Sequence, residues 1–313
     1  MAARDDVGEA KRALDAAVRR VRDDREHGAS WLAREVGRAV VDATSERPAG
    51  GAGALLDTVH DALRAFARAR PSMAAVANVA AALWASGSGA SGPNERLAAI
   101  REEARRTAGS EDTALAAIVA ALRPLAAGVI YTHSRSGTVE RALVTLANER
   151  QVAREAFVST SFPGGEGKAT ARALAGAGWR VTLVADAACG VFVSHAAVVI
   201  VGADSVRADG SLVNKVGTCP LALAARQAQV PVYAVCETFK VAAPDFPLEL
   251  EEMDPHELLP EPVPGVEARN VYFDYTPPEL IAGVVTERGV LHQADVGRLA
   301  QAAGRALRRL EGE

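Results

Sequence analysis

The feature that most constrains the fold is a change of texture near residue 123. From there on, short apolar runs rich in β-branched and aromatic residues alternate with helical patterns. The runs are GVIYTHS, AFVSTSF, WRVTLVAD, AAVVIVGAD, VPVYAVCE and NVYFDYT. Strands that alternate with helices are joined by right-handed crossovers and form a parallel sheet. The pattern predicts an α/β protein with a Rossmann-like domain over residues 123–313.

The N-terminal part of the chain has a different pattern. Between residues 5 and 122 helix formers dominate, and apolar residues recur at spacings of three and four. Gly/Ser/Pro-rich stretches at 45–54 and 86–95 interrupt this pattern and predict loops between helices. We therefore expect a helical N-terminal domain over residues 1–122.

Composition excludes several classes of function. A net charge of −4, a pI near 5.9 and the absence of any Lys/Arg run argue against nucleic-acid binding, which needs a basic face. The 3 cysteines have no metal-like spacing, so we expect free thiols and no metal. We also expect no cofactor. The charged N-terminus lacks the apolar region of a signal peptide, and no uncharged run could span a membrane. We expect a cytoplasmic protein with no membrane partner.

Ligands of parallel sheets bind outside the carboxyl ends of the strands. The polar residues expected there are Thr132, His133, Ser134, Ser159, Thr160, Ser161, Asp186, Asp204, Glu237 and Asp274. The chain contains neither G-x-x-x-x-G-K-[ST] nor a G-x-G-x-x-G that leads from a strand into a helix. We expect GEGKAT, residues 165–170, to open a helix whose N–H groups face an anion.

The stretch VGADSVRADGSLVNKVGT, residues 201–218, carries a specific resemblance. GADSV, NKVGT, ETFK and FDYTPPELI follow one another in the order found in the initiation factor 2B alpha/beta/delta family, which this chain resembles over residues 128–292. HGAS at 27–30 and RPSMAAVAN at 70–78 are similar to it more faintly. The family includes methylthioribose-1-phosphate isomerase and ribose-1,5-bisphosphate isomerase.

The resemblance implies a homodimer, or a higher homo-oligomer, with a site for a small-molecule sugar phosphate between a helical and a Rossmann-like domain. It implies that Asp204 acts in proton transfer, with Ser134 at the position of the second catalytic residue. The implied substrate-binding residues are Gly28, Ala29, Ser30, Arg70, Ser136, Glu166, Gly167, Asn214 and Lys215. Lys215 and Arg70 would neutralise phosphate charge.

Two departures from the isomerase pattern leave the function open. Ser134 replaces a cysteine, and a hydroxyl exchanges protons less readily than a thiol unless a base assists. In STSFPGGEGKAT, Ser161 or Phe162 replaces an arginine and Glu166 replaces a glutamine. The alternatives are an isomerase for a ribose-1-phosphate derivative, an enzyme for another phosphorylated sugar, and a non-catalytic regulatory or scaffold subunit that binds a sugar phosphate or nucleotide.

Some of these residues also have purely structural explanations. Spacing alone places Arg70 on a solvated helix face, and His133 either orients Ser134 or is a structural histidine. We expect Asp274 to cap a helix that begins at Pro277.

Overall fold

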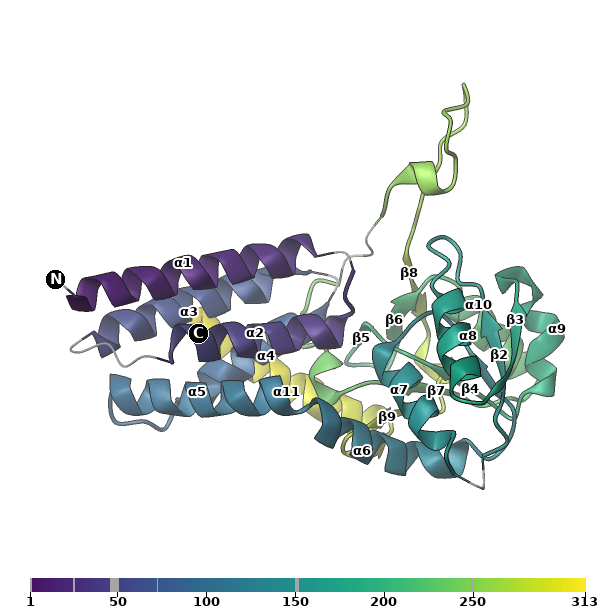
Figure 1. Ribbon diagram of the computed structural model, residues 1–313, viewed down its shortest axis with the longest axis horizontal. Coiled ribbons are helices and arrows are strands. Elements are labelled where there is room, and N and C mark those ends of the chain that lie inside the picture. The colour runs from purple at the N-terminus through teal and green to yellow at the C-terminus, as the bar shows by residue number, and fades with distance from the viewer. Residues whose placement is uncertain are drawn as a thin grey trace. The chain divides into compact units, whose positions relative to one another are not determined.

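The computed structural model describes residues 2–24, 26–45, 51–71, 73–149, 152–248, 250 and 252–313, and of residues 2–5 only the backbone. The described chain divides into two compact units (Figure 1). The helical unit contains residues 1–112, 239–248 and 298–313, and the sheet unit contains residues 113–238 and 249–297. The predicted domain boundary between residues 122 and 123 stays a prediction. The two compact units are divided differently, and each contains more than one stretch of the chain.

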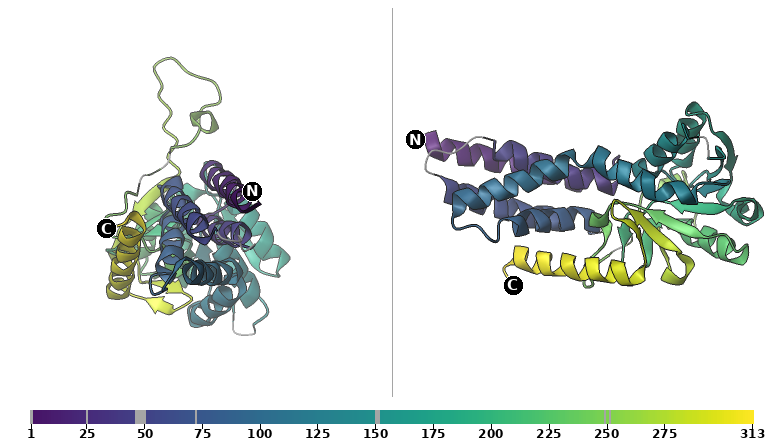
Figure 2. Two further views of the ribbon diagram at one scale, coloured as in Figure 1. Left: turned by 90° about the vertical axis from the view of Figure 1, so that its left-hand side faces the viewer. Right: turned by 90° about the horizontal axis from the view of Figure 1, so that it is seen from below.

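The helical unit is a bundle whose helices run along one another (Figure 2). Its helices are α1 (Ala2–Asp23), α2 (Ala29–Ala43), α3 (Ala52–Ala69), α4 (Ala74–Ser86) and α5 (Pro93–Gly109), together with the C-terminal part of α11 (Gln293–Glu311). The helix α4 is apolar on all sides and almost entirely buried, as expected of a helix surrounded by others. The loop predicted at 86–95 separates α4 from α5. Most of the other predicted loop, residues 46–50, lies outside the described residues.

Segments distant in sequence complete this bundle. The side-chain amide of Asn78 on α4 donates to the carbonyls of Phe239 (2.8 Å) and Val241 (2.7 Å). His60 on α3 donates through Nε2 to the carbonyl of Leu310 on α11 (2.8 Å), and Leu310 is fully buried in the helical core. These bonds join residues 239–241 and the C-terminal helix α11 to the N-terminal helices, so both belong to the helical unit.

The sheet unit contains a seven-stranded sheet in the order β10-β9-β7-β4-β1-β2-β3 among its described residues. All strands are parallel to their neighbours except β10, which pairs antiparallel with β9. The strands are β1 (Ile130–Thr132), β2 (Glu155–Ser159), β3 (Arg180–Val184), β4 (Val198–Val201), β7 (Val232–Val235), β9 (Gly283–Thr286) and β10 (Gly289–Leu291). The expected parallel α/β fold is confirmed.

The helices cover this sheet on two faces. They are α6 (Glu111–Leu122), α7 (Gly137–Leu146), α8 (Gly167–Gly176), α9 (Cys189–Phe192) and α10 (Thr218–Gln227). Alternate residues of β2 serve the two faces, because successive side chains of a strand point to opposite sides. Ala156 and Val158 join the core formed with α6, α7 and α8, whereas Phe157 packs against Phe192 of α9.

A second, three-stranded antiparallel sheet, β5-β6-β8, was not anticipated. Its strands are β5 (Ser205–Val206), β6 (Leu212–Lys215) and β8 (Phe273–Thr276). NVYFDYT was expected to be a strand of the parallel sheet, and this was wrong, because β8 pairs with β6 instead. An arm, residues 252–271, precedes β8 in the chain. A β-bridge pairs Glu252 with Val271, and the arm extends away from the sheets (Figure 1).

Candidate functional site

The predicted catalytic residues follow neighbouring strands of the parallel sheet. Ser134 comes after β1 and Asp204 after β4, and these two strands pair in parallel. Chain order reverses between them, since β2 and β3 lie beyond β1 while β7 and β9 lie beyond β4. This is the switch point at which open α/β sheets bind ligands. Ser134 and Asp204 therefore share one edge of the sheet.

Ser134 is held in an unusual backbone conformation. Its φ of 67° lies in the left-handed region, which non-glycine residues seldom adopt. The Ser134 N–H donates to Oγ of Ser161 (2.7 Å), and its carbonyl accepts from Oγ1 of Thr170 (3.1 Å). The Ser134 hydroxyl donates to Oε1 of Glu166 (3.4 Å). The loop thus aims the hydroxyl at a carboxylate.

A tight helix start explains how Glu166 reaches Ser134. Glu166 immediately precedes α8, and a Cβ on Gly167 would lie 1.8 Å from the carbonyl oxygen of Ser159. Only glycine permits this approach of the helix to the end of β2. The loop is further fixed by Asp186, whose carboxylate accepts from the N–H groups of Ser161 and Phe162 (both 2.7 Å). These contacts place the Glu166 side chain beside the end of β1.

Glu166 also faces a buried cation. Lys215 is 3% exposed, and its Nζ lies 3.1 Å from Oε1 of Glu166 and 3.5 Å from the centroid of the Tyr272 ring. Among the described residues, Nζ of Lys215 and Oε2 of Glu166 are buried without a hydrogen-bond partner. Leaving such groups unsatisfied costs about 1–3 kcal/mol each, so they mark a place that needs an explanation beyond packing. We name Ser134, Glu166, Lys215 and Tyr272 the lysine cluster.

Asn214 points away from this cluster, because adjacent residues of β6 face opposite sides. Its side-chain amide donates to Oγ1 of Thr218 (3.0 Å). A Cβ on Gly202 would lie 2.9 Å from Oγ of Ser136 and 3.8 Å from Oδ1 of Asn214, so Ser136 and Asn214 both border Gly202. The Asp204 N–H donates to the carbonyl of Val213, which keeps Asp204 beside β6 (3.0 Å). Ser136 also caps α7, where its Oγ accepts from the N–H of Val139 (3.4 Å).

Asp274 caps a different helix from the one we expected. Its carboxylate accepts from the N–H of Gly217 (2.8 Å) and of Cys219 (3.1 Å), at the start of α10. The segment at Pro278–Leu280 is a single 3₁₀ turn. Burial raises the pKa of Asp274 to about 6, against these backbone donors, which lower it. The pairing of β6 with β8 brings Asp274 to α10, and nothing in the local sequence indicates that pairing.

His133 has the contacts of a structural residue. It is 2% exposed, and its Nε2 donates to the carbonyl of Val216 (2.9 Å). Burial lowers its pKa, against that hydrogen bond, which raises it. Burial thus favours the neutral ring, which joins the end of β1 to the loop before α10.

The remaining predicted residues belong to the helical unit. Gly28 is the N-cap of α2, and Ala29 and Ser30 begin the helix. Arg70 is the C-cap of α3, is 4% exposed and donates through Nη1 to the carbonyl of Asp24 (2.8 Å). Arg70 is thus not a solvated residue of a helix face. A site that combines these residues with those of the sheet unit stays a prediction.

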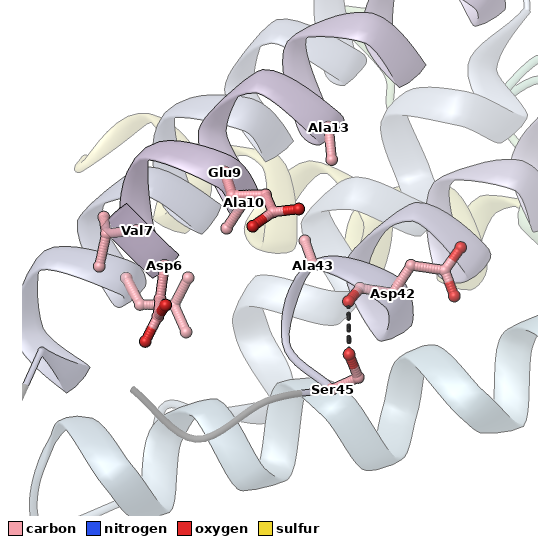
Figure 3. A pocket seen from close by; sticks show the side chains of 9 residues that line it. Asp6, Val7, Glu9, Ala10, Ala13, Asp42, Ala43 and Ser45 are labelled. Atoms are coloured by element: carbon pink, nitrogen blue, oxygen red, sulfur yellow. Dashed lines mark hydrogen bonds between the residues drawn. The ribbon is translucent and has the colours of Figure 1, made fainter. Parts of the chain in front are cut away.

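The described residues form a cavity in the helical unit, but no metal-binding cluster and no membrane-spanning helix. A cavity in the helical unit is lined by Asp6, Glu9 and Asp42 among small and apolar residues, and includes none of the predicted site residues (Figure 3). No group of three or more His, Cys, Asp or Glu side chains in the described parts of the chain could hold a metal ion. Among the same residues, no helix has the length and apolar character needed to cross a membrane.

Sequence reasoning missed part of this arrangement. Thr170 and Tyr272 had no role in the prediction, and Glu166 was predicted to bind substrate but not to contact Ser134 or Lys215. A polar residue one turn into a helix and an aromatic residue before a strand are both common, so neither position gave a signal. Only the fold brings them to Ser134 and Lys215.

The fold and this strand edge define a two-unit α/β protein with a polar site at the switch point of its sheet. The model of the Initiation factor 2 subunit family matches residues 25–293. A putative translation initiation factor eIF-2B subunit 2-like protein of Pyrococcus horikoshii is 33% identical over 277 residues, 88% of this chain and 94% of that protein. The chain belongs to the Initiation factor 2 subunit family.

Proteins with three different names are similar to this chain. Ribose 1,5-bisphosphate isomerase of Archaeoglobus fulgidus is 36% identical over 167 residues, which are 52% of this chain and only 53% of that enzyme. Among solved structures, translation initiation factor eIF-2B of Pyrococcus horikoshii has a TM-score of 0.73 at 30% identity, covering 89% of this chain and 96% of that one. 5-Methylthioribose 1-phosphate isomerase of the same organism has a TM-score of 0.70 at 22% identity, covering 96% and 87%, and shows the shared fold.

Proposed function

We propose that this protein is an aldose–ketose isomerase that acts on a ribose-1-phosphate derivative, resembling ribose 1,5-bisphosphate or methylthioribose 1-phosphate. The observation that carries the proposal is the hydrogen bond from the Ser134 hydroxyl to Glu166 (3.4 Å). A serine hydroxyl is a poor proton carrier by itself, but an adjacent carboxylate can pass protons to it and accept them from it. The similarity to ribose 1,5-bisphosphate isomerases supports the same reaction class.

The proposed mechanism has two proton transfers, one from Ser134 and one to Asp204. A sugar blocked at C1 by phosphate isomerises only after its ring opens. The Ser134 hydroxyl gives its proton to the ring oxygen as the bond from C1 to that oxygen breaks, and the Lys215 ammonium returns a proton to Ser134 through Glu166, whose Oε1 contacts both residues. Hydrogen then moves from C2 to C1, and the C2 hydroxyl gives its proton to Asp204. Proton transfers by positioned groups of this kind contribute about 10²–10⁴ in rate. Arg70 is proposed to hold the phosphate as a bidentate fork.

The experiment is a turnover assay of the purified protein against a panel of 1-phosphorylated pentoses, with ketose formation as the readout. Turnover that is lost in Asp204→Asn and reduced in Ser134→Ala is the expected result. Wild-type turnover at the background rate with every pentose would contradict the proposal.

A second candidate is a non-catalytic regulatory or scaffold subunit that binds a sugar phosphate or nucleotide. It is favoured by Ser134 in place of a thiol, and by the relatives that match over nearly their whole length, which carry initiation-factor names. Ligand binding without turnover in the same assay would select it.

We also infer a homodimer formed through residues 270–291. This segment folds as β8, a 3₁₀ turn and the β9–β10 hairpin, and leaves Tyr275 and Val290 partly exposed. Aromatic and aliphatic residues left partly exposed in this way are typical of interface cores. A monomeric mass by light scattering would exclude the dimer.

A further inference from the structure

The lysine cluster presents more donors than its protein partners use. A lysine ammonium has three N–H groups. In the described residues the Lys215 ammonium has an ion pair with Oε1 of Glu166 (3.1 Å) and the ring face of Tyr272 (3.5 Å), but no hydrogen bond that satisfies it. Because the side chain is 4% exposed, water does not serve these donors as it does on a surface lysine.

The same cluster presents an acceptor. Oε1 of Glu166 is shared between Ser134 and Lys215, while Oε2 is buried and has no partner in the described chain. The Glu166 side chain as a whole is 28% exposed, so the cluster opens on the side of Glu166. An ammonium donor, a carboxylate acceptor and a hydroxyl thus stand together, and the charges of Lys215 and Glu166 cancel.

This set of groups discriminates between ligand chemistries. A phosphate dianion, the main form of a sugar phosphate at neutral pH, accepts hydrogen bonds and donates none, so it would suit Lys215 but be repelled by Glu166 at hydrogen-bonding distance. A ligand ammonium would suit Glu166 and be repelled by Lys215. A hydroxyl both donates and accepts, so it can satisfy the two residues at once. Lys168 in the first turn of α8 is exposed and does not offset the charge of Glu166 within the cluster.

We propose that the lysine cluster binds an uncharged sugar hydroxyl and selects against a second phosphate, so that the ligand is a sugar monophosphate rather than a bisphosphate. The inference rests on the proposed function, because it takes a sugar phosphate as the ligand. It differs from the role expected of Lys215 as a phosphate-binding cation, since the pairing with Glu166 neutralises that cation.

The test is calorimetric binding of ribose 1-phosphate, ribose 5-phosphate and ribose 1,5-bisphosphate to the wild type and to Glu166→Gln. The wild type should bind at least one monophosphate more tightly than the bisphosphate. In Glu166→Gln, which keeps the shape and removes the charge, the bisphosphate affinity should rise roughly tenfold or more relative to that monophosphate, because a like charge at contact is lost. Glu155→Gln is the matched control, since Glu155 starts β2 at the other edge of the sheet and pairs with the exposed Arg180.

The outcomes separate this inference from the function on which it rests. Tighter binding of the bisphosphate than of both monophosphates by the wild type, or an unchanged ratio in Glu166→Gln, overturns the inference and leaves the sugar-phosphate site standing. Failure of all three ligands to bind the wild type overturns both. The wild-type comparison needs no substitution, so it decides the matter even if the variant does not fold.

Discussion

Two carboxylates of the sheet unit stand where a helix begins, and their surroundings differ. Asp274 accepts N–H groups at the first turn of α10, and its oxygens are occupied by the backbone. Glu166 immediately precedes α8, but its side chain turns to Ser134 and Lys215 instead of capping the helix, and one of its oxygens has no hydrogen-bond partner among the described residues. The Asp274 carboxylate is thus saturated by the fold, whereas Glu166 keeps the open acceptor that we propose for a ligand.

The largest effect is expected from substitutions of Ser134, the residue whose hydroxyl contacts Glu166. Ser134→Ala removes the hydroxyl that Glu166 accepts, so the isomerase rate should fall about 100-fold, the lower end of what a positioned acid or base contributes. Ser134→Cys should raise the rate above the wild type, because a thiol with an ordinary pKa near 8.5 exchanges protons close to neutrality. Initial rates for the three proteins, with thermal midpoints to confirm folding, provide the measurement.

One pattern of rates would contradict the catalytic role given to Ser134 and Glu166. If Ser134→Ala and Ser134→Cys both turn over like the wild type, the contact between Ser134 and Glu166 is not catalytic. The open acceptor of Glu166 would then need a different explanation.

The next effect concerns the two buried cations assigned to the ligand. Lys215→Ala and Arg70→Ala each remove a charged hydrogen-bond donor, so each should weaken sugar-phosphate binding by about 1.5–3 kcal/mol. Lys168→Ala is the matched control, because Lys168 is an exposed cation in the first turn of α8, two residues from Glu166. Calorimetric affinities decide the question. Unchanged affinity in both Lys215→Ala and Arg70→Ala would remove the sugar-phosphate site and leave only the fold.

The Asp274 side of the comparison predicts a dependence of stability on pH. Burial raises the pKa of Asp274 from the ordinary 3.8 to about 6, against the backbone donors that lower it, so the folded protein holds this proton more tightly than the unfolded chain does. Its contribution to the free energy of unfolding is therefore complete below about pH 4 and is lost as the pH rises through about 6. The shift is linked to at most about 3 kcal/mol, and relaxation around a partly solvated carboxyl reduces this to about 1–2 kcal/mol.

Urea denaturation between pH 4 and pH 7 measures this contribution. The wild type should lose that amount of stability relative to Asp274→Asn over the interval. Asp209→Asn is the control, and its difference from the wild type should stay nearly flat over this interval. Although partial burial opposes it, hydrogen bonds from Ser211 lower the pKa of Asp209 from the ordinary 3.8, so its contribution is lost only as the pH falls below about 4. A flat difference between the wild type and Asp274→Asn would mean that Asp274 is as well solvated as an ordinary carboxyl.

Much of the sheet was predictable from the sequence, for an identifiable reason. Buried parallel strands are continuous apolar runs, so VVIV of β4 and VYAV of β7 stand out from the helical patterns around them. The second sheet was hidden, because β5 has only two residues and β6, LVNK, ends in polar residues. Its pairing with β8 joins segments almost 60 residues apart across the arm.

The site was predictable to a similar degree. Strand order alone places Ser134 and Asp204 at one edge, since consecutive polar ends of parallel strands meet there. The contact between Glu166 and Lys215 depends on the close approach of Gly167 to Ser159 and on the course of β6, and neither is encoded in a local pattern. For the same reason the burial of Arg70 could not be read from the periodicity of α3, which ends just before it.

The smallest effect is expected at Tyr272, whose ring and hydroxyl have different contacts. Tyr272 presents its ring face to Lys215, while its hydroxyl donates to Oε2 of Glu257 in the arm (2.6 Å). Tyr272→Phe keeps the ring and removes the hydroxyl, so it should lower the free energy of unfolding by about 1 kcal/mol and leave sugar-phosphate affinity unchanged. Tyr272→Leu also removes the ring, and the lost cation–π contact should weaken binding roughly threefold or more. Urea denaturation and calorimetry on both variants test this division. Equal affinities for Tyr272→Phe and Tyr272→Leu would show that the ring does not hold Lys215 for the ligand, and Tyr272 would then belong with Asp274 among the groups that only stabilise the fold.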